Sequence, residues 1–205
     1  MIFKKLLIMI QSSLKIILGS SSIYRQKLLS GYVSNFESIA PEIDESQYAN
    51  ESPQDLSMRL AKTKARKIAD IKPQHVVIGS DQVVSFKKIN IGKKINYESA
   101  YQTLIEFSGK KIYFYTSVVI MIKEKKIELT HLDKTMIEFK PFGKKELEVY
   151  LKSQDIFDST AAIKYESKQF QQLVNQIITE DEEAIIGLPM IWLMEELKKL
   201  ELNRI

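Results

Sequence analysis

The stretch VIGSDQVV at residues 77–84 constrains the fold more than any other part of the sequence. Its two ends, Val77-Ile78 and Val83-Val84, are β-branched, which is typical of a short strand buried in a sheet core. Between them, Gly79-Ser80-Asp81-Gln82 introduces a carboxylate and an amide. Because an ionised carboxylate is costly to bury without a partner, Asp81 needs a cation nearby or a helix end to cap.

The chain of 205 residues is long enough for one domain with a sizeable core, and 44% apolar with 27% charged residues is a globular composition. The absence of cysteine excludes disulfides and thiolate metal sites. It also indicates a reducing compartment, so we expect a cytoplasmic protein. His75 and His131 are the only histidines, which argues against a multi-histidine metal site.

The net charge of +4 and the pI of about 9.0 suit an anionic partner, either nucleic acid or a phosphorylated small molecule. A lysine-rich proteome would give the same excess with no function attached. The apolar run at residues 6–10 is too short to span a membrane, so we expect no membrane segment and treat residues 1–14 as a loose extension of a single domain at 15–205.

Strands and helices are expected to alternate, and a hairpin follows, which predicts an α/β fold with a mixed, twisted sheet flanked by helices. Ser20, Ser21 and Ser22 are candidate caps for one helix, and Ser52 with Pro53 and Asp55 forms a capping pattern for the clearest helix. We expect strands at 15–18, 36–39, 76–85, 111–122 and 127–139, and helices at 20–29, 52–70, 98–107 (ending at Ser108-Gly109), 143–152 and from Pro189 onward.

The standard phosphate-binding loops, the nucleophile-elbow motif and the zinc-protease motif are all absent from the sequence. One phosphate-binding candidate remains at LGSSSIYR, residues 18–25, where a strand leads through small residues into a helix. Backbone amides at such a helix start favour a phosphate, and Ser20, Ser22 and Arg25 add donors. The alternative is a capped helix with a surface arginine.

Lys64 falls near the centre of the apolar face of the expected helix at 52–70, which also carries Leu56, Leu60 and Ile68. A lysine in such a position either extends its ammonium out to water or needs an anion inside. Asp81 and Glu45, the latter in the turn PEIDE, are candidate anions and could together hold Mg²⁺. Asp81 could instead cap a neighbouring helix.

In this order, these segments resemble the Maf family of nucleoside triphosphate pyrophosphatases over nearly all of residues 15–200. The matching segments are LGSSSIYRQKLL (18–29), PEIDES (41–46), ESPQDL (51–56), RLAKTKA (59–65), VIGSDQVV (77–84), Gly92-Lys93-Lys94, Ser108-Gly109-Lys110, Tyr115-Thr116 and Gly187-Leu188-Pro189. The resemblance implies two lobes around a central cleft, as in Maf and ITPase proteins, and a homodimer. It also implies a nucleoside triphosphate substrate, and we expect no nucleic-acid partner.

The resemblance implies a catalytic set of Asp81, Glu45, Lys64, Lys93 and Arg25. Glu45 and Asp81 would hold Mg²⁺ or Mn²⁺, Asp81 would act as the base, and the three cations would neutralise the phosphates. Ser20 and Ser22 would position the phosphate chain.

Gly-Ser-Asp-Gln and the aromatic Tyr24 resemble the branch that acts on 7-methyl-GTP, because an aromatic face attracts a flat, cationic base. Gln82, Lys164 and Glu166 would complete base recognition. The dTTP/UTP branch usually has threonine and arginine in place of Gln82 and Tyr24. Two alternatives therefore stay open: a dTTP/UTP-type pyrophosphatase, and a non-catalytic nucleotide-binding regulator of septation or cell division.

The chain departs from the family pattern at three places. Ile23 and Lys94 replace prolines, and Ser167-Lys168 stands where glycine is expected. The last departure falls at the base end of the expected site.

Overall fold

The computed structural model describes residues 15–93, 96–153 and 159–202, and its framework is one seven-stranded sheet. The strand order is β2-β1-β3-β5-β6-β7, with β4 paired to β3. The strands are β1 (Ile16–Gly19), β2 (Glu37–Ser38), β3 (Val76–Phe86), β4 (Ile89–Ile91), β5 (Lys111–Ile122), β6 (Ile127–Phe139) and β7 (Val174–Ile178). Since β1 runs parallel to β2 and β3 while the other pairs are antiparallel, the predicted mixed α/β sheet is confirmed.

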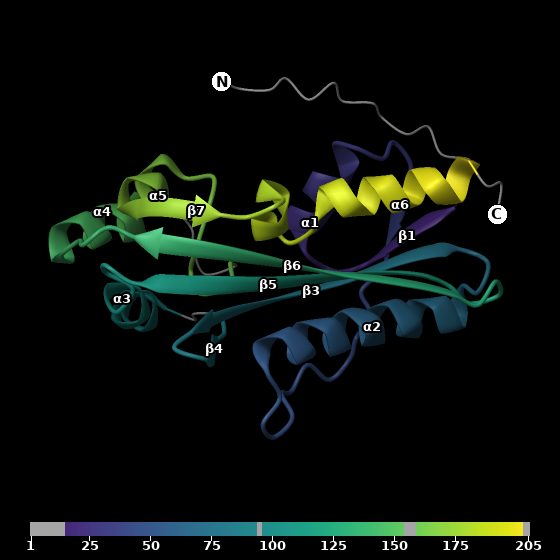
Figure 1. The fold of residues 1–205 in the computed structure, drawn as a ribbon, viewed down its shortest axis with the longest axis horizontal. Coiled ribbons are helices and arrows are strands. Elements are labelled where there is room, and N and C mark those ends of the chain that lie inside the picture. Colours follow the sequence, from purple (N-terminus) through teal and green to yellow (C-terminus); the bar gives the residue numbers. More distant parts are fainter. Residues whose placement is uncertain (1–14, 94–95, 154–158, 203–205) are drawn as a thin grey trace.

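Helices cover both faces of this sheet (Figure 1). They are α1 (Ile23–Ser30), α2 (Pro53–Ile71), α3 (Tyr97–Ile105), α4 (Lys144–Ser153), α5 (Lys168–Leu173), α6 (Met190–Leu202) and the 3-10 helix η1 (Glu182–Ile186). α2 packs on one face, and α1 and α6 pack on the other. None of these helices, within the described part of the chain, is long and apolar enough to cross a membrane.

Most of the expected elements are present, with ends shifted by one to three residues. Ser52 is the N-cap of α2, as predicted, and Ser22 is the one of the three candidate serines that caps α1. The expected helix end at Ser108-Gly109 is wrong, because α3 stops at Ile105 and its C-cap is Glu106. The sequence did not predict β4, β7, α5 or η1, and the predicted loose extension at 1–14 lies outside the described residues.

α2 lies unusually close to β3, and a glycine makes this approach possible. A Cβ atom on Gly79 would lie 2.4 Å from the Ala61 carbonyl oxygen and 2.6 Å from the Ala65 nitrogen. Side-chain packing in this layer is carried by small and β-branched residues, among them Ala61, Ala65, Ile17 and Val77. The close contact fixes the depth at which the side chains of α2 meet the sheet.

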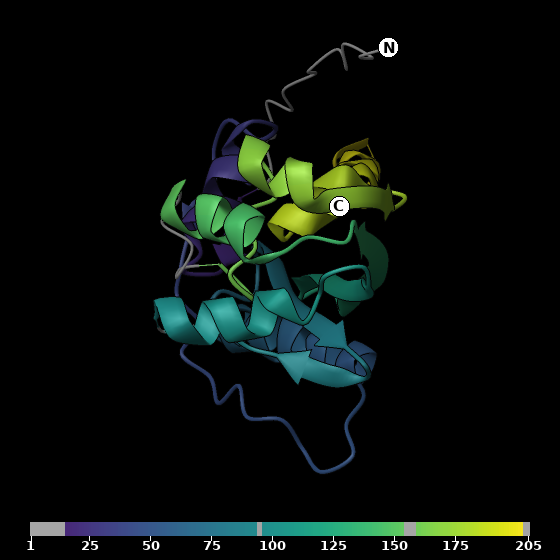
Figure 2. The same ribbon diagram turned by 90° about the vertical axis from the view of Figure 1, so that its left-hand side faces the viewer.

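One edge of β3 is left open in its middle, and this opening sets the position of the site. β1 pairs with β3 only as far as Gly79, and β4 begins its pairing at Val84. Residues 80–83 therefore have β5 on one side and, in the described part of the chain, no strand on the other. The loop at 39–52 extends away from the sheet on the α2 side, as Figure 2 shows in the end view.

Replacing Gly79 by alanine is expected to lower the free energy of unfolding by at least about 2 kcal/mol, because the added methyl group overlaps the backbone of α2. Chemical denaturation with urea measures the change. Gly92→Ala is the matched control, since a Cβ there meets nothing within 4 Å, and we expect a change within about 1 kcal/mol. Equal stability of Gly79→Ala and the parent chain would contradict this account of the packing.

Candidate active site

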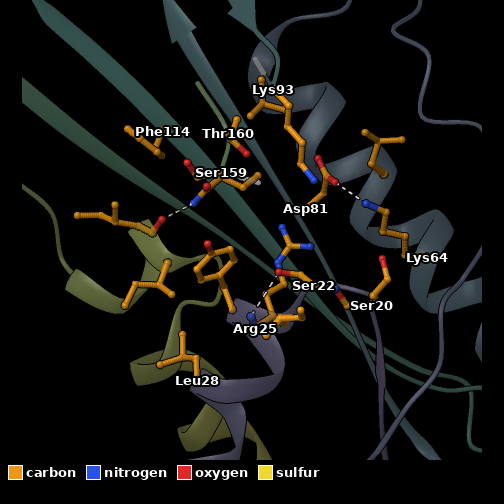
Figure 3. A pocket seen from close by; sticks show the side chains of 18 of the residues that line it. Ser20, Ser22, Arg25, Leu28, Lys64, Asp81, Lys93, Phe114, Ser159 and Thr160 are labelled. Atoms are coloured by element: carbon orange, nitrogen blue, oxygen red, sulfur yellow. Dashed lines mark hydrogen bonds and ion pairs between the residues drawn. The ribbon is translucent and has the colours of Figure 1, made fainter. Parts of the chain in front are cut away.

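A cleft of about 1260 Å³ opens along the unpaired edge of β3. Ligand cavities are commonly about 300–1,000 Å³, so this one is large enough for a nucleotide-sized molecule. All of the predicted catalytic, substrate-binding and metal-binding residues line it: Ser20, Ser22, Tyr24, Arg25, Glu45, Lys64, Asp81, Gln82, Lys93, Lys164 and Glu166. Figure 3 shows how several of these side chains converge from different elements.

The β1–α1 turn supplies hydroxyl groups and one anchored cation. The Ser22 hydroxyl accepts a hydrogen bond from the Arg25 amide at 3.4 Å, and the Ser20 hydroxyl accepts one from the Ser22 amide at 3.1 Å. The Arg25 guanidinium donates from Nε to the Gly187 carbonyl at 3.0 Å and from Nη1 to the Ser80 carbonyl at 3.1 Å. Two backbone oxygens from distant segments therefore fix this cation at the cleft.

Burial lowers the pKa of Arg25 from its ordinary value, and the negative charges of Asp81 and Glu45 act in the opposite direction. A guanidinium remains charged in proteins, so Arg25 keeps its positive charge here. The carbonyl of Gly187 that holds it also accepts from the Ser80 hydroxyl at 2.8 Å. The segment at Gly187 thus acts as a fixed support for the cationic side of the cleft.

Lys64 is buried, with its side chain 8% exposed, and its ammonium contacts two carboxylates. The Nζ atom lies 2.6 Å from Asp81 Oδ1 and 2.7 Å from Glu45 Oε1. The sequence left open whether this ammonium reaches water or an anion, and the structure places it between two anions. Glu45 and Asp81, which come from a loop and from β3, are brought together by this contact.

Opposing effects act on the pKa of Asp81. Burial raises the pKa of Asp81 above its ordinary value, and the charges of Lys64 and Arg25 oppose that rise. Glu45, which is a like charge, raises the pKa further. A carboxylate with this balance is a stronger base than an exposed aspartate while remaining paired with cations.

Two carboxylates and open cleft space suit a hard divalent cation whose other ligands are water and phosphate oxygens. Within the described ranges, no group of three or more acidic or histidine side chains is gathered for a metal. The donor set therefore fits Mg²⁺ or Mn²⁺ held partly by a substrate, and does not fit a fully protein-coordinated metal.

Lys93 and Tyr24 mark two further directions of the cleft. Lys93 is exposed, pairs with Thr160 through an isolated β-bridge, and extends its side chain toward Asp81 (Figure 3). Its neighbour Lys94 lies outside the described residues. On the other side, the Lys164 ammonium lies 5.8 Å from the centre of the Tyr24 ring, within the range of a cation–π contact.

Gln82 is held by groups that the sequence did not point to. Its Nε2 atom donates to the Ala184 and Ile185 carbonyls of η1, at 2.9 and 3.0 Å, and lies 3.0 Å from Thr116 Oγ1. These contacts with η1 and Thr116 use both protons of the Gln82 amide. Glu166 lines the cleft as an exposed side chain.

Several contributing residues escaped the sequence analysis. Tyr150 is buried and its hydroxyl donates to the Ala162 carbonyl at 2.8 Å and accepts from the Lys164 amide at 2.9 Å, which fixes the backbone of the segment with Lys164. Tyr32 donates to the carboxylate of Glu183 in η1, and both residues line the cleft. The acidic cap Asp181 before η1 was the one local signal that could have pointed to this helix.

Removing the cap of α1 should weaken the turn that holds the hydroxyl groups and Arg25. Ser22→Ala is expected to lower the free energy of unfolding by about 1 kcal/mol, since the Arg25 amide loses its acceptor. Ser21→Ala is the matched control: Ser21 is the exposed neighbour and is not the cap, so its loss should change stability by less than about 0.5 kcal/mol. Equal effects in thermal or urea unfolding would contradict the capping role.

Comparison with known proteins places this chain in a family. The family model described as "Maf-like protein" matches residues 15–200. A protein of Albidiferax ferrireducens named 7-methyl-GTP pyrophosphatase is 37% identical, over 86% of this chain and 88% of its own length. A protein of the same name from Aliivibrio fischeri is 35% identical over 92% of this chain and 97% of its own.

Among solved structures, the Staphylococcus aureus Ham1 protein shares the fold, with a TM-score of 0.50 at 12% identity over 89% of this chain and 99% of that one. At that identity the likeness extends to the fold alone. The two sequence relatives support more than a shared fold, because each is at least 35% identical over at least 86% of this chain. The chain therefore belongs to the Maf family.

Proposed function

We propose that this protein is a nucleoside triphosphate pyrophosphatase that converts 7-methyl-GTP, or a closely related modified nucleotide, to the monophosphate and pyrophosphate. The observation that carries the proposal is the convergence of Glu45, Asp81 and Lys64 in a cleft that also holds Arg25 and Lys93. Binding a triphosphate requires the positively charged side chains, and its hydrolysis requires the two carboxylates. The names of the Maf-family relatives support the same substrate.

The cations would bind and neutralise the triphosphate. Arg25 is fixed by the Gly187 and Ser80 carbonyls, so its remaining donors can meet phosphate oxygens without reorganisation. Lys64 and Lys93 approach from other sides, and the start of α1 adds Ser20, Ser22 and backbone amides. Charge neutralisation at the leaving group is the main requirement of phosphoryl transfer.

Glu45 and Asp81 would hold Mg²⁺ or Mn²⁺ together with phosphate oxygens and water. When bound, a divalent cation polarises phosphoryl oxygens and lowers the pKa of coordinated water. Asp81 would accept the proton of the water that attacks the α-phosphorus. The new bond joins the water oxygen to that phosphorus, the bond to the bridging oxygen breaks, and pyrophosphate leaves with the negative charge.

The other end of the cleft would receive the base. The Tyr24 ring offers a face for stacking, and a base that carries positive charge gains cation–π attraction there. Gln82 is oriented by η1 with its Nε2 on backbone carbonyls, so its Oε1 atom can accept from a donor on the base. Glu166 is a second acceptor at this end.

Asp81→Asn tests the assignment of the base. The amide keeps the size of the side chain but cannot accept the proton, so we expect turnover to fall by about 10²–10⁴-fold. Pyrophosphate release from a panel of nucleoside triphosphates with Mg²⁺ or Mn²⁺ is the measurement, with circular dichroism as the folding control. A variant that turns over at the parent rate would remove Asp81 from this role.

The double variant Tyr24→Arg with Gln82→Thr should move the preference from 7-methyl-GTP toward dTTP and UTP, because the aromatic face and the amide acceptor are both lost. The ratio of kcat/KM values for the two substrate groups measures it. Tyr24→Phe is the matched control, since it retains the ring and should keep the parent preference. An unchanged ratio in the double variant would refute this account of base recognition.

A further inference from the structure

We infer that Lys64 is a placeholder for the divalent cation: its ammonium holds Glu45 and Asp81 together before metal arrives, and passes to the triphosphate when metal enters. This inference rests on the proposed function for the identity of the incoming groups. It assigns Lys64 a positioning role toward the metal-binding carboxylates in addition to any contact with phosphate.

The first support is the geometry of the three side chains. One ammonium contacts one oxygen of each carboxylate, at 2.6 and 2.7 Å, so those two oxygens can be no further apart than the two distances combined. A metal bound by both residues would occupy this same region. Magnesium binds oxygen at about 2.0–2.1 Å, so the ammonium and the metal cannot share the position between these atoms.

The second support is the balance of charge. Asp81 is 9% exposed at its side chain and lies close to Glu45, so two like charges meet beside the protein interior. Without a cation, repulsion and desolvation would drive these carboxylates apart or protonate Asp81. Lys64 supplies that cation through its contacts with both carboxylates. A divalent ion would supply more charge, and it would then repel the ammonium that stands in its place.

The third support is the difference between Arg25 and Lys64, the two cations whose charges act on Asp81. Arg25 is held by two backbone carbonyls, whereas the Lys64 ammonium contacts only Glu45 and Asp81 among the described residues. A lysine side chain has a flexible four-carbon stem. Glu45 is 60% exposed and lies in the loop at 39–52, outside any helix or strand. Lys64 and Glu45 are therefore the movable members of the site, and Arg25 is the fixed one.

Exchange of partners would couple the binding of metal and substrate. An ammonium released from the carboxylates would lie in a largely buried position without a counter-ion until the triphosphate arrives. Metal binding should therefore strengthen triphosphate binding, and the reverse must hold by the same factor. The site would load both together and bind the metal alone weakly.

The test is the affinity of Mn²⁺ for the full-length protein without nucleotide, measured by electron paramagnetic resonance and by calorimetry. Lys64→Met is expected to bind Mn²⁺ roughly ten-fold more tightly than the parent protein, because no ammonium has to be displaced. Lys93→Met is the matched control: it removes the same charge from a lysine of the same cleft that does not bridge the carboxylates. We expect it to change the affinity by less than about three-fold.

An unchanged or weaker Mn²⁺ affinity in Lys64→Met would overturn the inference, as would an equal gain in Lys93→Met, which indicates only a general field effect. If Lys64→Met does not fold, a Mg²⁺ titration of the parent protein tests the inference. In protein labelled with ¹⁵N-lysine, Mg²⁺ alone should shift the ammonium resonance of Lys64, assigned from its absence in Lys64→Arg. A resonance that stays in place at saturating Mg²⁺ refutes the exchange.

These titrations separate the inference from the proposed function. If the parent protein releases no pyrophosphate from any triphosphate, the proposed function fails, but the Mn²⁺ affinities and the Mg²⁺ titration still decide the role of Lys64. If pyrophosphate is released and the affinities do not differ, the function stands and the placeholder role falls.

Discussion

The buried ammonium of Lys64 is the interaction around which the rest of the site is arranged. It projects from the apolar face of α2, where its neighbours Leu60, Ala61 and Ile68 are buried against the sheet. A cation in that layer must find anions close by or the helix could not dock so tightly. Asp81 on β3 and Glu45 on the loop before α2 supply these anions. The docking of α2 on the sheet therefore also brings the two carboxylates together.

The cleft exists because the sheet is incomplete on one edge. Where β1 has ended and β4 has not begun, the backbone of β3 has groups that no strand satisfies. The Ser80 carbonyl in this gap accepts from Arg25 instead, and the Gly187 carbonyl shares the same guanidinium. The Ser80 oxygen, left unpaired in this gap, thus supports a cation together with the Gly187 carbonyl. The functional residues lie at this place because a regular sheet would have filled it.

Sequence reasoning succeeded where the determining contacts are local and failed where they are distant. The position of Lys64 on its helix follows from spacing alone, and the cap at Ser22 is one of the three adjacent serines that the sequence offers. β4 was missed because its hairpin turn places Lys87 and Lys88 at φ values of 51° and 66°, a conformation usually signalled by Asn-Gly. The anchoring of Gln82 on η1 joins residues more than a hundred positions apart, and no local pattern encodes such a contact.

The two ends of the cleft differ in charge, and this difference bears on which nucleotide would fit. Cations dominate where Arg25, Lys64 and Lys93 lie, whereas carboxylates act on the phenols at the other end. Burial raises the pKa of Tyr32, and hydrogen bonding and charge from Glu183 raise it further; burial and the charges of Glu182 and Glu166 likewise raise the pKa of Tyr165. A neutral base would gain only stacking on Tyr24 and hydrogen bonding at this end. A base that carries a positive charge would also be attracted by these carboxylates, and it would replace the Lys164 ammonium at the face of the Tyr24 ring.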